Sequence, residues 1–505
     1  MSTVVASLML VGSAGAVLAD DTASEGEKHL NMAIYWFGDD LDPGHGWNGW
    51  TLTRGAVGEN LVTVTEDLEL VGQLADSWEA VDDTTWKFHI RPNVTFQNGN
   101  PLTAEAVKSS IERSIEINER GQTNLKLDSI ETDGEYVIFK TLEPYGAFLA
   151  NLSEPLFIIV DTTADTEAFA ETPVCTGPYM VTSFDPGVSF DAVAYKDYWG
   201  GTPGLDSVTV YNIEDDNTRA MTLQAGNIDM LQRVTATDLT LFENNPDYTV
   251  QSTIGTREQF LFMNTEAAPF DDENIRLAFN AGIDYDAVAA VVGGGAVATG
   301  APFPPTPPGG YDERTQAAFD PDLCASLLEE AGYTDSDGDG YVDKDGEPLE
   351  IQVTVNNNAD DYSMLAELVQ AQMKDRGVKL VINQVENAED DRAEGNFQLL
   401  FGNWQTVSTG DTQWFLDQVF RSDATDNYGR YNDPELDEVI GKLSTAFELD
   451  EREELTKQAS QIIIDRGFGC YLVSPTNINI ARSNVSNMHT FPIDYYFLTA
   501  DTTIE

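Results

Sequence analysis

The sequence is poor in cysteine and histidine, and this shortage excludes several kinds of site. Its three cysteines, Cys175, Cys324 and Cys470, lie far apart, so they form neither a disulfide framework nor a zinc-binding spacing. One disulfide in an oxidising compartment and three buried free thiols are both open interpretations. The four histidines also lack any metal-binding spacing. We therefore expect no metal held by cysteine or histidine.

Basic side chains are scarce as well. The chain has 27 Lys and Arg against 86 Asp and Glu, a formal net charge of −59. Such a surface repels phosphates, so we expect no nucleic-acid partner and no binding to an anionic membrane. The acids are spread along the chain, which favours a strongly hydrated surface suited to salty surroundings, where counter-ions screen self-repulsion. The alternative is an electric field that concentrates cationic ligands in a cleft.

Apolar runs long enough to span a membrane are absent, so we expect no membrane insertion. Residues 4–18 are apolar and small, and they end at Ala19 before two aspartates, which is typical of a secretory signal peptide. The usual basic start is missing, because the first basic residue is Lys28. We expect a signal peptide over residues 1–19, cleavage after about Ala19, and a soluble periplasmic protein.

Catalytic signatures are also missing. There is no Gly-x-x-x-x-Gly-Lys-Ser/Thr phosphate loop, no His-Glu-x-x-His and no Gly-x-Ser-x-Gly elbow. Carboxylates are so dense that pairs arise by chance, which leaves a secreted carbohydrate-active hydrolase with two acids as the enzymatic alternative. A secreted structural or chaperone-like protein is a third class. We expect a protein that is not an enzyme.

What is present is a large, mixed α/β chain. Its 505 residues exceed what one core holds, and 41% are hydrophobic, so at least two lobes are expected. Thr85–Ile90 alternates like a strand, and Thr103 caps a following helix. The amphipathic segment 362–376 predicts a helix followed by a strand at 378–382, an α/β unit.

Ten short motifs occur in order between residues 30 and 480. They are LADSWE (74–79), WKFHIR (86–91), VTFQNGNPLTAEAV (94–107), TGPY (176–179), YWGG (198–201), QAGNID (224–229), NIRLAF (274–279), AGID (281–284), LLEEAGY (327–333) and YNDPELD (431–437). Taken together, they resemble the extracytoplasmic solute-binding proteins of family 5, which serve peptide, nickel and opine ABC importers.

The resemblance implies a two-lobed periplasmic-binding-protein fold of class II type, with an enlarged lobe I and a hinge between the lobes. Lobe I would comprise residues 20–258 and 474–505, with an extra subdomain at about 61–175, and lobe II residues 259–473. The hinge strands would lie near 259–264 and 470–474.

The resemblance also implies a function: a substrate-binding receptor of an ABC importer. It would enclose a small peptide-like or amine-bearing solute by hinge closure and deliver it to the permease and ATPase, and we expect a monomer. A nickel or metal-chelate receptor of the same family is the alternative.

The cluster Gly46–Trp50 follows the first expected strand, where the family lines its cleft. Trp47, Asn48 and Trp50 would contact a ligand, with the two tryptophans as flat apolar walls, or the tryptophans would pack in the core of the lobe. Arg54 would pair with a ligand carboxylate, or with one of the many acids.

Two departures from the family bear on the ligand. Peptide receptors carry an Asp three residues after the cleft tryptophan, here Trp404, to pair with the peptide amine; this chain has Val407, with Asp411 nearby as a substitute. Nickel-chelate receptors carry an Arg in the segment 153–157, where this chain has Glu154. A carboxylate there would repel an anionic chelate and favour a cationic group.

A separate segment matches the start of a calcium loop. Its positions 1, 3, 5, 7 and 9 are Asp335, Asp337, Asp339, Tyr341 and Asp343. Position 6 is glycine, but position 12 is Gly346 and the acid Glu347 comes one residue late. We expect either a structural calcium ion or a solvated hairpin turn, and no other cofactor.

Overall fold

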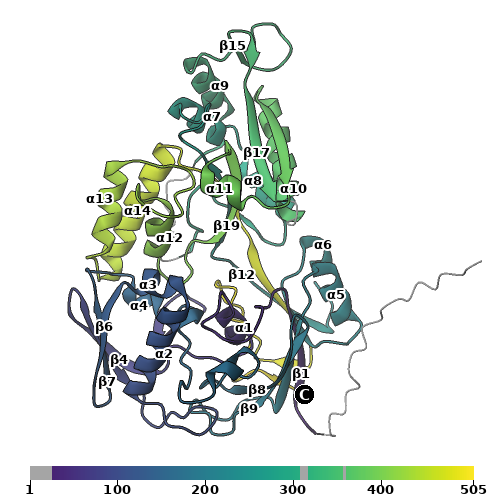
Figure 1. Cartoon of the computed structure of the whole chain (residues 1–505). Helices are drawn as coiled ribbons and strands as arrows, with labels where there is room; N and C mark the ends of the chain where they lie inside the picture. The colour runs from purple at the N-terminus through teal and green to yellow at the C-terminus, as the bar shows by residue number, and fades with distance from the viewer. Residues whose placement is uncertain (1–25, 307–316, 357–359) are drawn as a thin grey trace, which may run out of the picture.

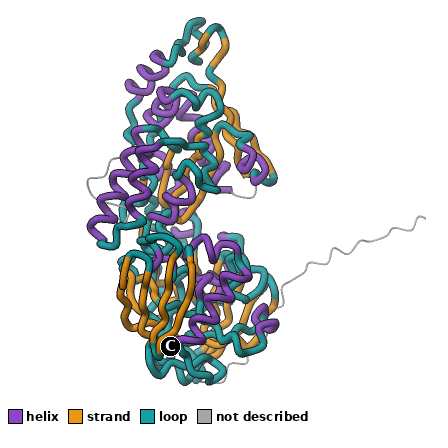
Figure 2. Tube along the Cα trace, turned by 60° about the vertical axis from the view of Figure 1, so that its left-hand side comes forward, coloured by secondary structure: helices purple, strands orange, loops and turns teal. Residues whose placement is uncertain are grey.

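The computed structural model describes residues 26–306, 317–356 and 360–505, which form two lobes joined by a narrow waist (Figures 1 and 2). The expected signal peptide lies outside the described residues. Within the described ranges, no helix combines the length and apolarity that crossing a bilayer requires. The three cysteines are free and buried, which decides between the two interpretations of them.

Lobe I is built on a seven-stranded sheet. Its order is β12 (Tyr248–Ile254), β21 (Thr476–Arg482), β11 (Met230–Gln232), β1 (His29–Ile34), β10 (Ser207–Asn212), β9 (Ser189–Ala194) and β8 (Tyr179–Asp185). The central strand β1 runs parallel to both neighbours, and apolar clusters cover both faces of the sheet, as parallel strands require. The remaining elements are α1 (Gly49–Arg54), η1 (Pro155–Phe157), η2 (Thr166–Ala170), α5 (Asp216–Gln224), α6 (Ala236–Leu239), β22 (Val485–Ser486) and β23 (Thr503–Ile504).

A subdomain of lobe I has its own antiparallel sheet. Its order is β4 (Ala75–Asp82), β5 (Thr85–Ile90), β7 (Tyr136–Thr141) and β6 (Leu127–Asp133). In β5 every second residue is buried, as the alternation predicts. Thr103 accepts a hydrogen bond from the Ala106 amide at the start of α2 (Ala104–Ile117), which is the expected cap. The subdomain also contains β2 (Val62–Val64), β3 (Leu70–Gly72), α3 (Glu119–Leu125) and α4 (Phe148–Asn151).

Lobe II is built on a six-stranded sheet. Its order is β14 (Val297–Ala298), β20 (Cys470–Ser474), β13 (Arg257–Met263), β19 (Leu399–Gln405), β17 (Glu350–Asn356) and β18 (Lys379–Val385). The predicted α/β unit is present as α10 (Asp360–Asp375) followed by β18. Two apolar clusters pack on this sheet. The other elements are α7 (Glu273–Ala281), α8 (Tyr285–Val292), α9 (Pro321–Glu330), β15 (Asp343–Lys344), β16 (Glu347–Pro348), α11 (Glu389–Glu394), α12 (Gln413–Val419), α13 (Pro434–Leu443) and α14 (Leu449–Asp465).

The chain crosses between the two large sheets at two places that touch. One crossing is Gly255-Thr256, between β12 and β13, and the other is Pro475, between β20 and β21. The Gly255 amide donates to the Pro475 carbonyl oxygen at 3.0 Å. A Cβ on Gly255 would come within 2.8 Å of that oxygen, so glycine permits the close approach. We call these two crossings the hinge.

Candidate ligand-binding cleft

A cavity of about 1030 Å³ lies between the lobes, and the hinge forms part of its lining. Its walls are rich in aromatic side chains from both lobes. They are Tyr35, Trp36, Trp47, Trp50, Trp404, Trp414, Tyr428 and Tyr495. Such a volume and lining suit a small organic ligand rather than a macromolecule.

The tryptophan cluster of lobe I forms one wall. The ring centroids of Trp47 and Trp50 are 5.0 Å apart, and that of Trp50 is 5.2 Å from Tyr495. Trp47 is 41% exposed, and the guanidinium of Arg120 covers its ring. Both tryptophans line the cleft. Asn48 does not line the cleft, and its buried side-chain amide donates to Asp40 at 2.6 Å.

Arg54 lies at the floor of the cleft and is almost fully buried. Its Nε donates to the Gln232 side chain at 3.2 Å and to the Asp494 carbonyl oxygen at 3.1 Å, and its Nη2 donates to the Tyr35 hydroxyl at 3.1 Å. Among the described residues, its Nη1 has no hydrogen-bond partner. This guanidinium nitrogen is therefore buried and unsatisfied at the edge of the cleft, although buried polar atoms normally have a partner.

Asp494 connects this floor to lobe II. Its carboxylate accepts hydrogen bonds from Arg257 at 2.5 Å, from Gln405 at 2.6 Å and from Tyr35 at 3.0 Å. Burial alone would raise the pKa of Asp494, but the charges of Arg257 and Arg54 hold it below its usual value. Arg54, Arg257 and Asp494 together therefore carry a net positive charge in a strongly acidic protein.

Sequence reasoning missed Asp494, which follows Arg54 by 440 residues. The signal that could have identified it is the tail FPIDYYF, where a single acid interrupts an apolar and aromatic stretch. An isolated acid there needs a buried cation, since burying an unpaired charge is very unfavourable.

Glu154 lines the cleft, but its charge is balanced inside the wall. Its carboxylate accepts from the Leu156 amide at 2.7 Å, which caps η1, and from the indole of Trp50 at 3.3 Å. Arg120 lies 3.6 Å away as an ion-pair partner. The Glu154 carboxylate therefore already has three partners within the wall of the cleft.

The wall from lobe II contains Trp404 on β19, but neither Val407, at the position of the family Asp, nor its suggested substitute Asp411 belongs to the lining. Val407 is fully buried in the apolar cluster of lobe II and does not line the cleft. Both oxygens of Asp411 face the Arg452 guanidinium at 2.7 Å, outside the lining. A bidentate partner already occupies this carboxylate, so we correct the assignment of Asp411 to the ligand.

Unpartnered hydrogen-bond acceptors also belong to the lining of the cleft, on the neighbouring strands β13 and β19 of lobe II. Among the described residues, the side-chain oxygens of Gln259, Asn403 and Gln405 are buried, lack hydrogen-bond partners and belong to residues of the lining. They require donors that the protein does not supply. A ligand with an anionic group and several N–H or O–H groups would satisfy both Arg54 and these acceptors.

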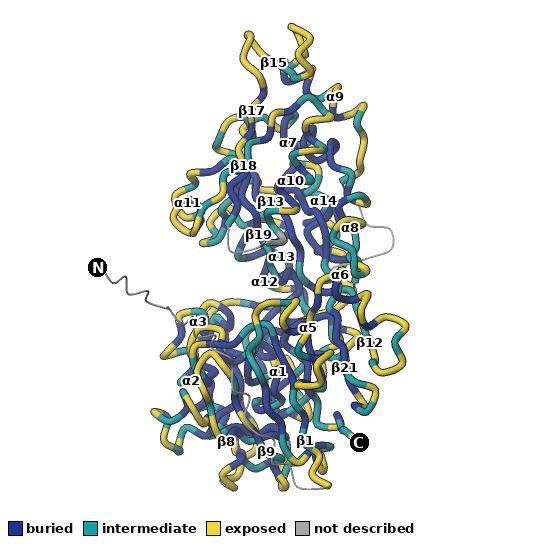
Figure 3. Tube along the Cα trace, turned by 90° about the vertical axis from the view of Figure 1, so that its right-hand side faces the viewer, coloured by how far each residue is buried: buried dark blue, intermediate teal, exposed yellow. Residues whose placement is uncertain are grey.

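The calcium-loop residues lie far from the cleft, at the outer tip of lobe II beside β15 (Figures 1 and 3). Carboxylate oxygens of Asp335, Asp337 and Asp343 come within 4.8 Å of one another. Asp335 also accepts from the Gly338 and Gly340 amides, while Asp339 accepts from the Tyr341 amide. Three of the five predicted groups therefore converge.

Comparison with known proteins gives consistent matches along the chain. Residues 69–427 match the family model described as bacterial extracellular solute-binding proteins, family 5 Middle. The nickel-binding protein NikA of Staphylococcus aureus is 27% identical over 450 residues, covering 88% of this chain and 89% of that protein. The glutathione-binding protein GsiB of Pectobacterium atrosepticum is 25% identical, with 88% of each chain covered. The crystal structure of the nickel ABC transporter from Bacillus halodurans is 30% identical, covers 95% of this chain and 100% of that one, and superposes with a TM-score of 0.81.

Proposed function

Because the chain belongs to the bacterial extracellular solute-binding proteins of family 5, we propose that it encloses a carboxylate-bearing, peptide-like or amine-bearing solute and presents it to an ABC importer. The observation that carries the ligand class is the set of buried polar atoms without partners on residues that line the cleft. Arg54 offers an unpartnered guanidinium nitrogen, and Gln259, Asn403 and Gln405 offer unpartnered oxygens. A small molecule with a carboxylate and amine or amide N–H groups complements both.

The proposed activity is binding without chemical change. The aromatic walls supply contact area, and the buried polar groups fix the orientation of the ligand. Closure of the two lobes about the hinge would exclude water, which strengthens each charge-assisted contact. The membrane partners would be the permease and the ATPase of the importer, with the receptor acting as a monomer outside the cytoplasm after removal of residues 1–19.

A metal chelate is the second candidate ligand. Relatives named for nickel support it, and one solved relative, NikA from Staphylococcus aureus, holds Ni(L-His)2. The described lining of the cleft contains no histidine, so the chelator rather than the protein would supply the imidazole ligands here. The carboxylates of such a chelator would use the same guanidinium at the floor.

A thermal-shift screen tests the proposal. Dipeptides, opines, nickel–histidine mixtures and polyamines would each be added to purified protein, with sugars as the comparison class. We expect stabilisation by compounds that carry a free carboxylate, and loss of that stabilisation when the carboxylate is amidated. Stabilisation by a neutral sugar alone, or by polyamines alone, would contradict the proposed ligand class.

A further inference from the structure

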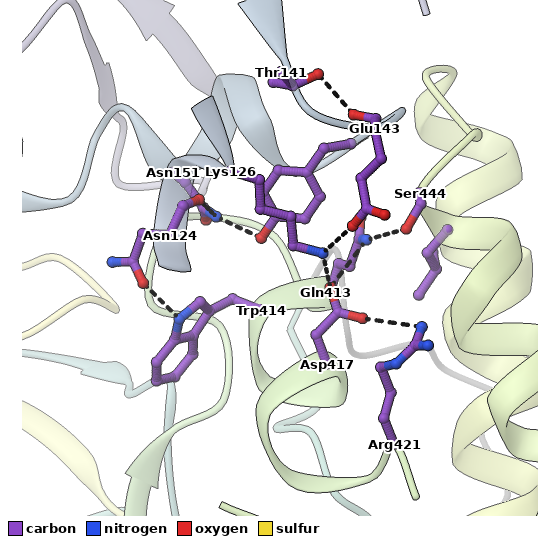
Figure 4. Close-up of polar contacts among 12 residues, drawn as sticks. Asn124, Lys126, Thr141, Glu143, Asn151, Gln413, Trp414, Asp417, Arg421 and Ser444 are labelled. Atoms are coloured by element: carbon purple, nitrogen blue, oxygen red, sulfur yellow. Dashed lines mark hydrogen bonds and ion pairs between the residues drawn. The ribbon is translucent and has the colours of Figure 1, made fainter. Parts of the chain in front are cut away.

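The lobes also meet outside the cleft, at a polar contact between helix α12 of lobe II and the segment after α3 of the subdomain (Figure 4). Asp417 of α12 lies 3.9 Å from the Lys126 ammonium across this boundary. Lys126 also pairs with Glu143 at 3.0 Å, and its ammonium lies 4.5 Å from the Tyr145 ring centre. The contact is therefore built from both lobes.

Asp417 is buried and incompletely partnered in this contact. Its side chain is only 6% exposed. From its own lobe it accepts from Gln413 at 3.2 Å and has Arg421 at 4.0 Å. Both cations stand at the limit of ion pairing, and among the described residues Asp417 Oδ1 has no hydrogen-bond partner. The negative charge of Asp411 lies close enough to act on Asp417, while Arg452 neutralises Asp411.

The same contact continues into the wall of the cleft. The Trp414 indole donates to Asn124 at 3.2 Å across the lobe boundary, and Thr409 donates to Asn151 at 3.4 Å. These four residues line the cleft. Rotation of lobe II away from the subdomain would break all of these bonds together, and it would expose Asp417 to water.

Building on the proposed function, we propose that Asp417 is a proton-linked latch: closing the lobes over the ligand takes up one proton at this carboxylate. Lys126 of lobe I lies next to the Asp417 carboxylate. Protonated Asp417 is neutral, so its burial does not require a close ion pair. Ligand capture would thus be favoured in mildly acidic surroundings, although Asp417 does not line the cleft.

The direction of the effect follows from linkage. Burial raises the pKa of Asp417 from 3.8 to about 6, against the opposing effects of Lys126 and Arg421. In an open arrangement water would return the pKa towards its usual value. The closed arrangement then binds the proton more tightly and gains population as the pH falls. Between pH 7.5 and pH 5 the ratio of closed to open molecules should rise about tenfold.

The distance between two spin labels, measured by pulsed electron paramagnetic resonance without any ligand, tests this. The labels would be placed at Glu116→Cys on α2 and Glu394→Cys on α11, which are exposed and lie on opposite lobes. The natural cysteines are buried and should not react with the label. We expect a short-distance population that grows from pH 7.5 to pH 5, with a midpoint between the usual pKa of Asp417 and its raised value of about 6.

Two variants and a control complete the experiment. Asp417→Asn should give the short distance at every pH, and Lys126→Met should shift the midpoint upwards, since it removes a cation that lowers the pKa. Glu438→Gln, an exposed change on α13, should behave like the wild type. An unchanged distance in the wild type across this range, or a pH response that persists in Asp417→Asn, would overturn the latch. Because no ligand is used, failure of the proposed ligand class cannot produce either result.

Discussion

Arg54 is the residue on which the proposed ligand recognition depends most. It is held by Gln232, Tyr35 and Asp494, so its free Nη1 is oriented before a ligand arrives. Holding a planar guanidinium in place beforehand reduces the entropy lost on binding. A lysine would keep the charge but lose the fork that fixes this orientation.

The first prediction concerns this residue. Arg54→Lys should weaken binding of a carboxylate ligand found in the screen by about 10- to 100-fold, the size expected for loss of a charge-assisted hydrogen bond. The amidated analogue should lose much less. Isothermal titration calorimetry would measure both, with Arg91→Lys as a control outside the cleft lining. Equal losses for the acid and its amide would show that Arg54 only supports the fold.

Glu59 shows that family-like motifs also serve stability. Its buried carboxylate accepts hydrogen bonds from Thr176, Tyr198 and Trp199 at 2.8, 2.8 and 2.9 Å, and these donors come from the motifs TGPY and YWGG. Burial raises the pKa of Glu59 from 4.5 to about 7 despite these bonds. The motifs therefore meet around a buried acid and not around the ligand.

The second prediction follows from that pKa. The folded protein holds the Glu59 proton up to about pH 7, so the contribution of Glu59 to stability falls as the pH rises from 4.5 to 7. Between pH 4.5 and pH 8, the wild type should lose about 3 kcal/mol more free energy of unfolding than Glu59→Gln. Urea unfolding at constant ionic strength would measure this. Parallel pH profiles of the two proteins would refute the assignment.

At the scale of elements, the hinge sets how the two lobes are arranged. The third prediction is that Gly255→Ala separates the two crossings, because its Cβ would meet the Pro475 carbonyl oxygen. We expect weaker ligand binding and a melting temperature several degrees lower. Gly441→Ala is the matched control, since a Cβ there meets nothing within 4 Å and helix α13 should gain stability. Equal effects of both changes would rule out a special role for Gly255.

The loop at the tip of lobe II carries the fourth prediction. We propose that Asp335, Asp337 and Asp343 bind a structural calcium ion. Added calcium should then raise the melting temperature of chelator-treated protein, and Asp337→Asn should abolish the rise. Asp345→Asn is the control, because asparagine tolerates the left-handed backbone found at that position. Absence of both a calorimetric heat and a thermal shift would leave the loop as a hairpin turn.

Elements that depend on local pattern are the ones that sequence could predict. The cap at Thr103, strand β5 and the unit of α10 with β18 follow from residues close in sequence, and so does the general place of the tryptophans. Asn48, Val407 and Asp411 lie in segments that border the cleft, yet their side chains point inwards or towards Arg452. Which side of a loop faces the cleft is decided by tertiary packing.

At the scale of the whole molecule, charge is distributed unevenly. The chain has about three acids for every basic residue, yet the described lining of the cleft contains five arginines and five acids. The arginines are Arg54, Arg120, Arg233, Arg257 and Arg392. The strongly acidic surface keeps the protein hydrated, while the cleft is locally neutral and able to accept an anionic group. This favours the hydrated-surface explanation of the acidity over attraction of cationic ligands.

Native mass spectrometry of the protein with the best ligand from the screen tests the central claim most directly. We predict one ligand per chain, loss of that complex in Arg54→Lys, and recovery of the ligand at unchanged mass after prolonged incubation. Recovery of a cleaved or modified product, or binding of several ligands without a dominant one-to-one complex, would contradict a receptor that captures one solute between its lobes.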